Sequence, residues 1–160
     1  MTDTNLSLEA LFSAQMQLLD PERAPGSLAP LELLLDDHLP VRITLHPDSR
    51  HWVVEAFAYD AVAILGPLRR SLVKTLLQIN AAALEGEQII CTLDGTDLVV
   101  VMTRWAVQEA DSSQFLPWLE YTVDQARRIR EAVRAIAMHG DEMAFAWQTS
   151  PTQGASAWSS

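Results

Sequence analysis

The stretch LLQINAAALEGEQIICTLDGTDLVVVMTRW, from Leu76 to Trp105, contains the change of pattern that decides the fold. Its first part is typical of the end of an apolar helix, for which Gly86 is a natural C-terminal stop. Its second part is typical of two apolar strands, 88–94 and 97–105, around Asp94-Gly95, a strong hairpin signal. The stretch therefore predicts a helix that leads directly into a β-hairpin.

The segments on either side predict further helices and strands. The expected helices span 7–20, 67–85 and 112–140, and the expected earlier strands span 41–45, 51–60 and, more briefly, 61–66. Three prolines and a glycine make 21–30 a loop, whereas 31–39 fits either one or two helical turns or an irregular segment. The order α-β-β-β-α-β-β-α predicts an α+β domain with an antiparallel sheet and helices packed on it.

Length and composition are those of one ordinary domain, with 160 residues of which 49% are hydrophobic. We expect a single domain over 1–147, followed by a small, polar and disordered tail over 148–160. The N-terminal MTDTNLSLEA lacks the features of a signal peptide, so a cytoplasmic protein is expected. The single cysteine, Cys91, allows neither an intrachain disulfide nor a cysteine-based zinc site.

The formal net charge of −10 limits the classes of partner. Nucleic acids and anionic membranes attract basic surfaces, so both are poor candidates for this chain. A partner whose binding segment is basic or neutral is a better match.

The central helix has more apolar surface than one small sheet needs. In projection its apolar side chains form two adjacent stripes, with Leu68, Leu72, Leu76, Ile79 and Ala83 in one, and Val73, Leu77 and Leu84 in the other. Arg70, Ser71, Lys74 and Gln78 occupy the opposite side. One stripe can pack on the sheet, and the other is covered either by the C-terminal helix or by the same helix of a second copy.

Asn80 lies between the two apolar stripes. A buried amide must find a hydrogen-bond partner. One interpretation is that Asn80 fixes the register of a helix seam between two copies. The other interpretation, at least as common in proteins, is a bond to a nearby strand carbonyl.

No residue pattern nominates an active site. Phosphate-binding glycine motifs, HExxH and GxSxG are all absent from the sequence. His46 and His51 flank a turn and form only a weak candidate metal pair, without a third ligand nearby in the sequence. Asp36-Asp37 and the hairpin acids Asp94 and Asp97 are better explained as turn residues. We therefore predict neither a catalytic residue nor a cofactor nor a metal ion.

The order of elements and several residues resemble the class I type III secretion chaperones, the CesT/Tir chaperone family. The similarity covers about residues 31–137. It rests on a helix with two leucines and an Asn near its end, then a Gly, then a hairpin of apolar strands. These features are Leu76, Leu77, Asn80, Gly86 and the strands 88–94 and 97–105. Within the family, the chain also resembles the general chaperones of plant-pathogenic bacteria, the HpaB kind.

The resemblance implies a non-enzymatic homodimer that binds the N-terminal regions of secreted effector proteins. It also implies that the effectors stay secretion-competent and are handed over to the secretion-system ATPase. For the dimer interface we expect Leu72, Leu76, Ile79, Asn80 and Ala83. For effector binding we expect Leu11, Phe12, Leu19, Val41, Ile43 and Leu45.

Two other classes stay open at the level of the sequence. A small α+β adaptor or regulator would bind one folded partner, and an unrecognised enzyme would use scattered His and Asp residues. Every residue named for an interface is also a candidate for the ordinary hydrophobic core.

Overall fold

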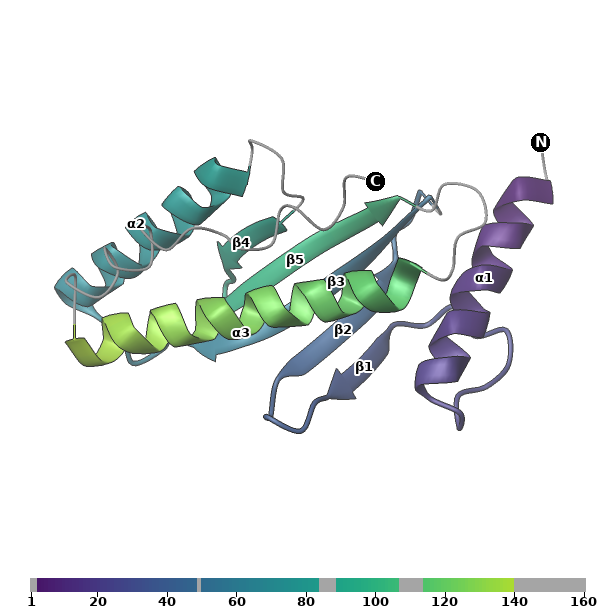
Figure 1. The fold of residues 1–160 in the computed structure, drawn as a ribbon, viewed down its shortest axis with the longest axis horizontal. Helices are drawn as coiled ribbons and strands as arrows, with labels where there is room; N and C mark the ends of the chain where they lie inside the picture. The colour runs from purple at the N-terminus through teal and green to yellow at the C-terminus, as the bar shows by residue number, and fades with distance from the viewer. Residues whose placement is uncertain (1–2, 49, 84–88, 107–113, 140–160) are drawn as a thin grey trace.

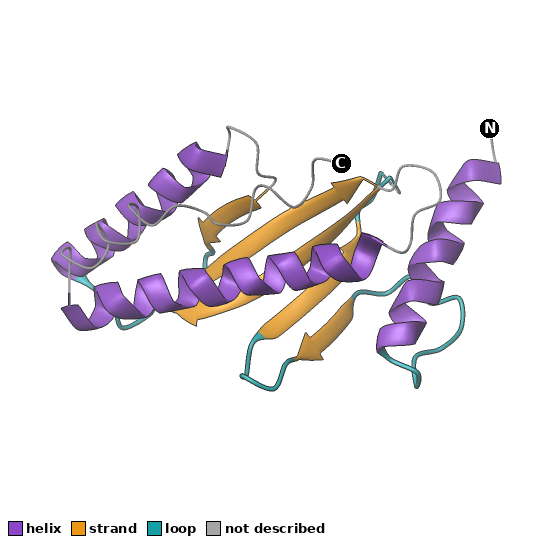
Figure 2. Cartoon of the chain, viewed as in Figure 1, coloured by secondary structure: helices purple, strands orange, loops and turns teal. Residues whose placement is uncertain are grey.

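The computed structural model describes residues 3–48, 50–83, 89–106 and 114–139. Its elements in chain order are α1 (Asp3–Leu19), β1 (Leu31–Leu34), β2 (Pro40–Leu45), β3 (His51–Asp60), α2 (Gly66–Ala83), β4 (Ile89–Leu93), β5 (Leu98–Ala106) and α3 (Phe115–His139). This order is the predicted α-β-β-β-α-β-β-α, and the fold is the predicted α+β class (Figure 2). The predicted tail, 148–160, and the predicted stop at Gly86 lie outside the described residues.

The strands form one five-stranded sheet in the order β1-β2-β3-β5-β4, and every neighbouring pair is antiparallel. β1 and β4 are therefore the two edge strands. The central pair of β3 and β5 has one register shift, between Phe57 and Tyr59. Helix α3 lies lengthwise across one face of the sheet, with α2 on the β4 side and α1 at the opposite end of the molecule (Figure 1).

One of the three early strands was predicted in the wrong place. Residues 61–66 do not form a strand. The Val62 N–H donates to Asp60 Oδ1 at 3.0 Å and the Ile64 N–H donates to the Ala61 carbonyl at 2.9 Å, which turns the chain toward α2. The missing strand is β1, inside the segment 31–39 for which helical turns or irregular structure were expected.

The core lies between α3 and the sheet. The face of α3 that meets the sheet is buried at Leu119, Val123, Ala126, Ile129, Val133 and Ile136. Leu116, one turn before Leu119, has a side chain that is 48% exposed. Two buried hydroxyl groups are paired across this interface, since Thr103 Oγ1 and Thr122 Oγ1 are hydrogen-bonded at 2.8 Å.

Aromatic packing attaches α1 to the sheet. Phe12 and Met16 are fully buried, and the Phe12 ring meets the Trp52 ring edge-on with centroids 5.4 Å apart. Trp52 in turn packs against Trp105 and Phe115, both with centroids at 5.0 Å. The aromatic cluster therefore joins α1, β3, β5 and the start of α3.

Helix α2 begins at a glycine for a conformational reason. Gly66 has a φ of 58°, a region that side chains with a Cβ rarely adopt, and Pro67 follows in the first turn, where it needs no N–H partner. The helix packs on β4 and on α3. Its start agrees with the predicted start at residue 67 to within one residue.

Candidate binding surfaces

The outer edge of β1 carries unpaired backbone groups. The Leu35 N–H donates to the Leu39 carbonyl at 3.0 Å, which fixes the alternation of hydrogen-bonded pairs between β1 and β2. In this register Leu33 exchanges its bonds with Val41, whereas the N–H and C=O of Glu32 and Leu34 point away from the sheet. No described residue bonds them. β1 therefore presents a free edge to which another strand can add.

The opposite edge is partly closed by a side chain. The Asp94 N–H bonds the Leu98 carbonyl, so the backbone groups of Cys91 point outward from β4. Asn80 Nδ2 donates to the Cys91 carbonyl at 2.8 Å, and the Cys91 N–H donates to Asn80 Oδ1 at 2.7 Å. The amide thus occupies the place of a neighbouring strand. Of the two interpretations of Asn80, the structure shows the bond to a strand.

The structure distinguishes the two apolar stripes of α2. The side that faces β4 and α3 carries Ser71, Leu72, Thr75, Leu76, Ile79 and Ala83, all buried. Ser71 was predicted on the polar side, but its hydroxyl bonds the Pro67 carbonyl at 3.2 Å and is covered. Val73 and Leu77 are 41% and 64% exposed. We name Val73, Leu77 and Ala81 the outer stripe.

The residues predicted for the dimer interface lie inside the single chain. Leu72, Leu76, Ile79 and Ala83 are at most 8% exposed, and Asn80 is bonded to β4. These side chains therefore already have partners within one protomer.

The residues predicted for effector binding divide into two groups. Phe12, Val41 and Ile43 are 0–2% exposed and belong to the core. Leu11, Leu19 and Leu45 are half-buried at its margin. Nearby on the chain, Leu18 and Leu34 are 74% and 68% exposed. The most exposed of these apolar side chains are therefore at two positions that the sequence prediction did not name.

A carboxylate and two arginines fasten the β1–β2 turn to α3. Arg127 Nε donates to Asp37 Oδ2 at 3.0 Å, and these bonds lower the pKa of the Asp37 carboxyl below its usual value. Arg130 Nε donates to the Ala58 carbonyl at 2.9 Å and its Nη1 donates to the Asp37 carbonyl at 3.0 Å. Arg130 is mostly buried, with 14% of its side chain exposed. The clamp holds the free edge strand in a fixed position.

The histidine pair and the hairpin acids serve turns. His46 and His51 both approach the Asp48 carboxylate, at 3.1 and 2.7 Å, and backbone N–H groups that bond this carboxylate lower the pKa of Asp48. Asp94 accepts from the Thr96 and Leu98 N–H groups, which lower its pKa, and Asp97 pairs with Arg69. Asp48 and Asp94 are therefore occupied within their own turns, and Asp97 connects the β4–β5 turn to α2.

No reactive centre emerges from the described residues. Cys91 is 2% exposed, and burial raises the pKa of its thiol to about 12, so it is not a thiolate near neutral pH. Within the described ranges, no group of three His, Cys, Asp or Glu side chains could hold a metal ion. None of the described helices is both long and apolar enough to cross a membrane.

The fold and its surfaces define a class, namely a small α+β binding domain with one free sheet edge and an exposed apolar helix stripe. The family model of the Tir chaperone protein (CesT) family matches residues 30–130. The chain therefore belongs to the Tir chaperone (CesT) family. No curated protein sequence matches the chain.

Solved structures share the fold. A chain of the ExsC–ExsE complex superposes with a TM-score of 0.63 at 16% identity, over 79% of this chain and 93% of that one. A chain of the HopA1–SchA chaperone–effector complex gives a TM-score of 0.58 at 12% identity, over 82% of this chain and 98% of that one. At these identities the similarity concerns the fold alone.

Proposed function

We propose that this protein is a cytoplasmic type III secretion chaperone. It binds the N-terminal regions of secreted effectors, keeps them secretion-competent and delivers them to the secretion ATPase. The observation that carries the proposal is the family match over 30–130, a range that includes the free edge of β1. The fold shared with chains of two complexes, one of them described as chaperone–effector, supports it.

The free edge supplies a physical mode of binding. An extended partner gains main-chain hydrogen bonds when it pairs with the Glu32 and Leu34 backbone. Main-chain pairing does not depend on partner sequence, so one edge can serve several clients, as expected of a general chaperone. Specificity then comes from apolar anchors nearby, such as the exposed Leu18 and Leu34.

Asn80 makes β1, rather than β4, the edge that an extended partner is expected to use. Its amide already satisfies Cys91, the middle of the three outward-facing residues of β4, so the open residues on that edge are interrupted. On β1 the outward-facing Glu32 and Leu34 follow each other at alternate positions without interruption. The Arg130 and Arg127 contacts to the β1–β2 turn hold β1 in place before a partner arrives. A preorganised edge reduces the ordering cost of binding.

We also propose a homodimer whose seam is the outer stripe of α2. Val73 and Leu77 are exposed on successive turns, whereas the other apolar stripe is covered within the chain. A helix stripe of this kind is self-complementary about a two-fold axis. Two copies would place two free β1 edges on one assembly.

The substitution Leu34→Pro tests the binding mode. Proline removes the N–H that points away from the sheet, but the β1–β2 ladder loses no bond, because Leu34 lies opposite Pro40 in a pair without ladder hydrogen bonds. Tagged protein is recovered from the secreting bacterium, and co-purifying proteins are quantified by mass spectrometry. We expect Leu34→Pro to reduce recovery of secreted proteins by about tenfold, since each tenfold change corresponds to about 1.4 kcal/mol.

Two variants provide matched controls. Leu34→Ala removes the same exposed side chain but keeps the N–H, and Leu93→Pro removes an outward N–H from the other edge. Both should retain more client protein than Leu34→Pro. If Leu34→Pro and Leu34→Ala recover equal amounts, backbone pairing at β1 is not the binding mode. Recovery of one folded partner in place of several effectors would instead favour the adaptor class.

A further inference from the structure

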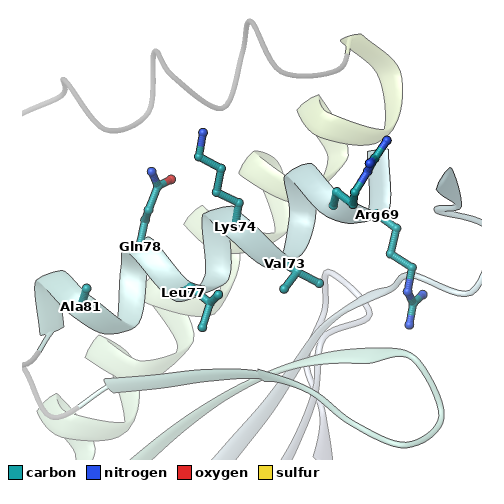
Figure 3. A pocket seen from close by; sticks show the side chains of 7 residues that line it. Arg69, Val73, Lys74, Leu77, Gln78 and Ala81 are labelled. Carbon is teal, nitrogen blue, oxygen red and sulfur yellow. The ribbon is translucent and has the colours of Figure 1, made fainter. Parts of the chain in front are cut away.

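A shallow groove runs along the exposed side of α2. It encloses about 490 Å³ and is lined by Arg69, Arg70, Val73, Lys74, Leu77, Gln78 and Ala81. Val73 and Leu77 lie on successive turns of the helix, with Lys74 and Gln78 beside them (Figure 3). The groove is thus an apolar strip, the outer stripe, with cationic side chains along its border.

The charge of the groove is opposite to that of the chain. Arg69 is paired with Asp97, but Arg70 and Lys74 have no ion pair among the described residues. The whole chain carries a formal charge of −10. Two exposed cations beside exposed apolar side chains fit a segment that combines acidic and apolar residues.

A segment with this composition begins close to the groove. Helix α3 ends at His139, and its C-terminal end lies near the N-terminal end of α2 in two different views (Figures 1 and 3). The chain continues beyond the described residues with GDEMAFAW, residues 140–147. Two acidic residues come first, and Met143, Phe145 and Trp147 follow at alternate positions.

The spacing of this segment matches the spacing of the groove. Alternate side chains of an extended segment lie on one side, roughly 6.6 Å apart. Residues four apart on a helix, such as Val73, Leu77 and Ala81, are about 6 Å apart along its axis. A segment that leaves the end of α3 would run along the groove from the N-terminal toward the C-terminal end of α2. Its two acidic residues would then lie beside Arg70 and Lys74, and its apolar residues would lie further along the outer stripe.

We propose that residues 141–147 dock in the α2 groove of their own chain. Asp141 and Glu142 face Arg70 and Lys74, and the three alternate apolar side chains cover the outer stripe. In so far as that stripe is the proposed dimer seam, the inference rests on the proposed function. The segment then competes with a second copy and regulates dimerisation.

An engineered disulfide tests the docking directly. The double variant Leu77→Cys/Phe145→Cys is oxidised at low micromolar concentration, and intrachain and interchain bonds are separated by non-reducing electrophoresis and peptide mass spectrometry. The native Cys91 is buried and has a raised thiol pKa, so it takes little part in the reaction. We expect an intrachain bond in most molecules. The control is Leu18→Cys/Phe145→Cys, which places the first cysteine on exposed α1.

The outcomes separate this inference from the proposed dimer. The docking is overturned, whatever the oligomeric state, if the intrachain disulfide forms in no larger a fraction of molecules than in the control. It is also overturned if only an interchain disulfide forms. If the bond forms, Phe145→Asp should strengthen dimerisation, measured by sedimentation. Both copies need a free groove in order to dimerise. If the groove is free in about one third of the chains, the apparent dissociation constant of the dimer is therefore raised roughly tenfold. An unchanged dissociation constant would exclude competition, whereas a monomer at all concentrations in both proteins would contradict only the seam.

Discussion

At the scale of the residue, Asn80 shows what a single amide contributes to the edge of a sheet. Its two hydrogen bonds to Cys91, at 2.8 and 2.7 Å, connect α2 to β4 as a strand would. Helix α2 ends three positions later at Ala83, and 84–88 lie outside the described residues. The contact therefore fixes the helix against the hairpin that follows it.

Replacing this amide should cost stability. Asn80→Ala leaves the outward N–H and C=O of Cys91 without their partner, and we expect the free energy of unfolding to fall by about 1–3 kcal/mol. Asn80→Asp keeps the acceptor but sets a carboxylate against the Cys91 carbonyl, so it should be the less stable variant at pH 7. Urea denaturation checks both. A change below about 0.5 kcal/mol in each would show that the amide contributes little.

Asp37 makes stability depend on pH. Hydrogen bonds from Arg127 depress its pKa in the folded state, so the carboxylate contributes stability above the unfolded-state pKa of about 3.9. That contribution is lost as the pH falls through the lower, folded-state value. Since Asp37 is about one-third exposed, we expect about 1 kcal/mol or less.

Asp37→Asn checks this pH dependence. The difference in unfolding free energy between wild type and variant should be constant above about pH 5 and shrink below about pH 4. Asp36→Asn is the matched control, since the neighbouring Asp36 forms no ion pair among the described residues. A difference that grows on acidification would contradict the depressed pKa.

At the scale of the element, α2 shows how far sequence reasoning reaches. Its two stripes follow from the 3.6-residue period, and its start follows from Gly66-Pro67. The period cannot say which stripe faces inward, because that depends on where β4 and α3 lie. The predicted seam residues, Leu76 among them, turned out to be covered within one chain.

The strand β1 was not predicted from the sequence, for a related reason. LELL is short, and its exposed alternate positions are Glu32 and Leu34. Four residues give no period to separate a strand from a helical turn. The edge exists because the antiparallel turn through His38, with a φ of 57°, returns the chain onto β2. The edge strand that we propose for binding is therefore the element with the weakest local signal.

Two substitutions on adjacent positions of α2 distinguish core from seam. Leu76→Glu puts a charge in the core, where it is 5% exposed in the wild type, and should abolish cooperative unfolding. Leu77→Lys adds a like charge beside Lys74 on both copies and should leave the fold intact while weakening the dimer by at least tenfold. Circular dichroism and light scattering read the two effects. A folded, fully dimeric Leu77→Lys would place the seam elsewhere, and exposed Leu18→Lys is the control.

At the scale of the whole molecule, the sheet has two unequal edges. β4 is partly closed by Asn80, and β1 is open and held by the Asp37–Arg127–Arg130 clamp. The α+β class, the element order and the family were predictable from sequence, because they rest on periods and turn signals spread over the chain. The difference between the edges was not, because it rests on one amide and one register.

The most direct test of strand addition at β1 is hydrogen exchange at this edge with and without a co-purified effector. The Glu32 and Leu34 amides, which point away from the sheet, should exchange rapidly in the free protein. Both should become strongly protected in the complex, whereas the Leu33 amide, already bonded to β2, should change little. Equal exchange of the Glu32 and Leu34 amides in the two states would contradict strand addition at β1.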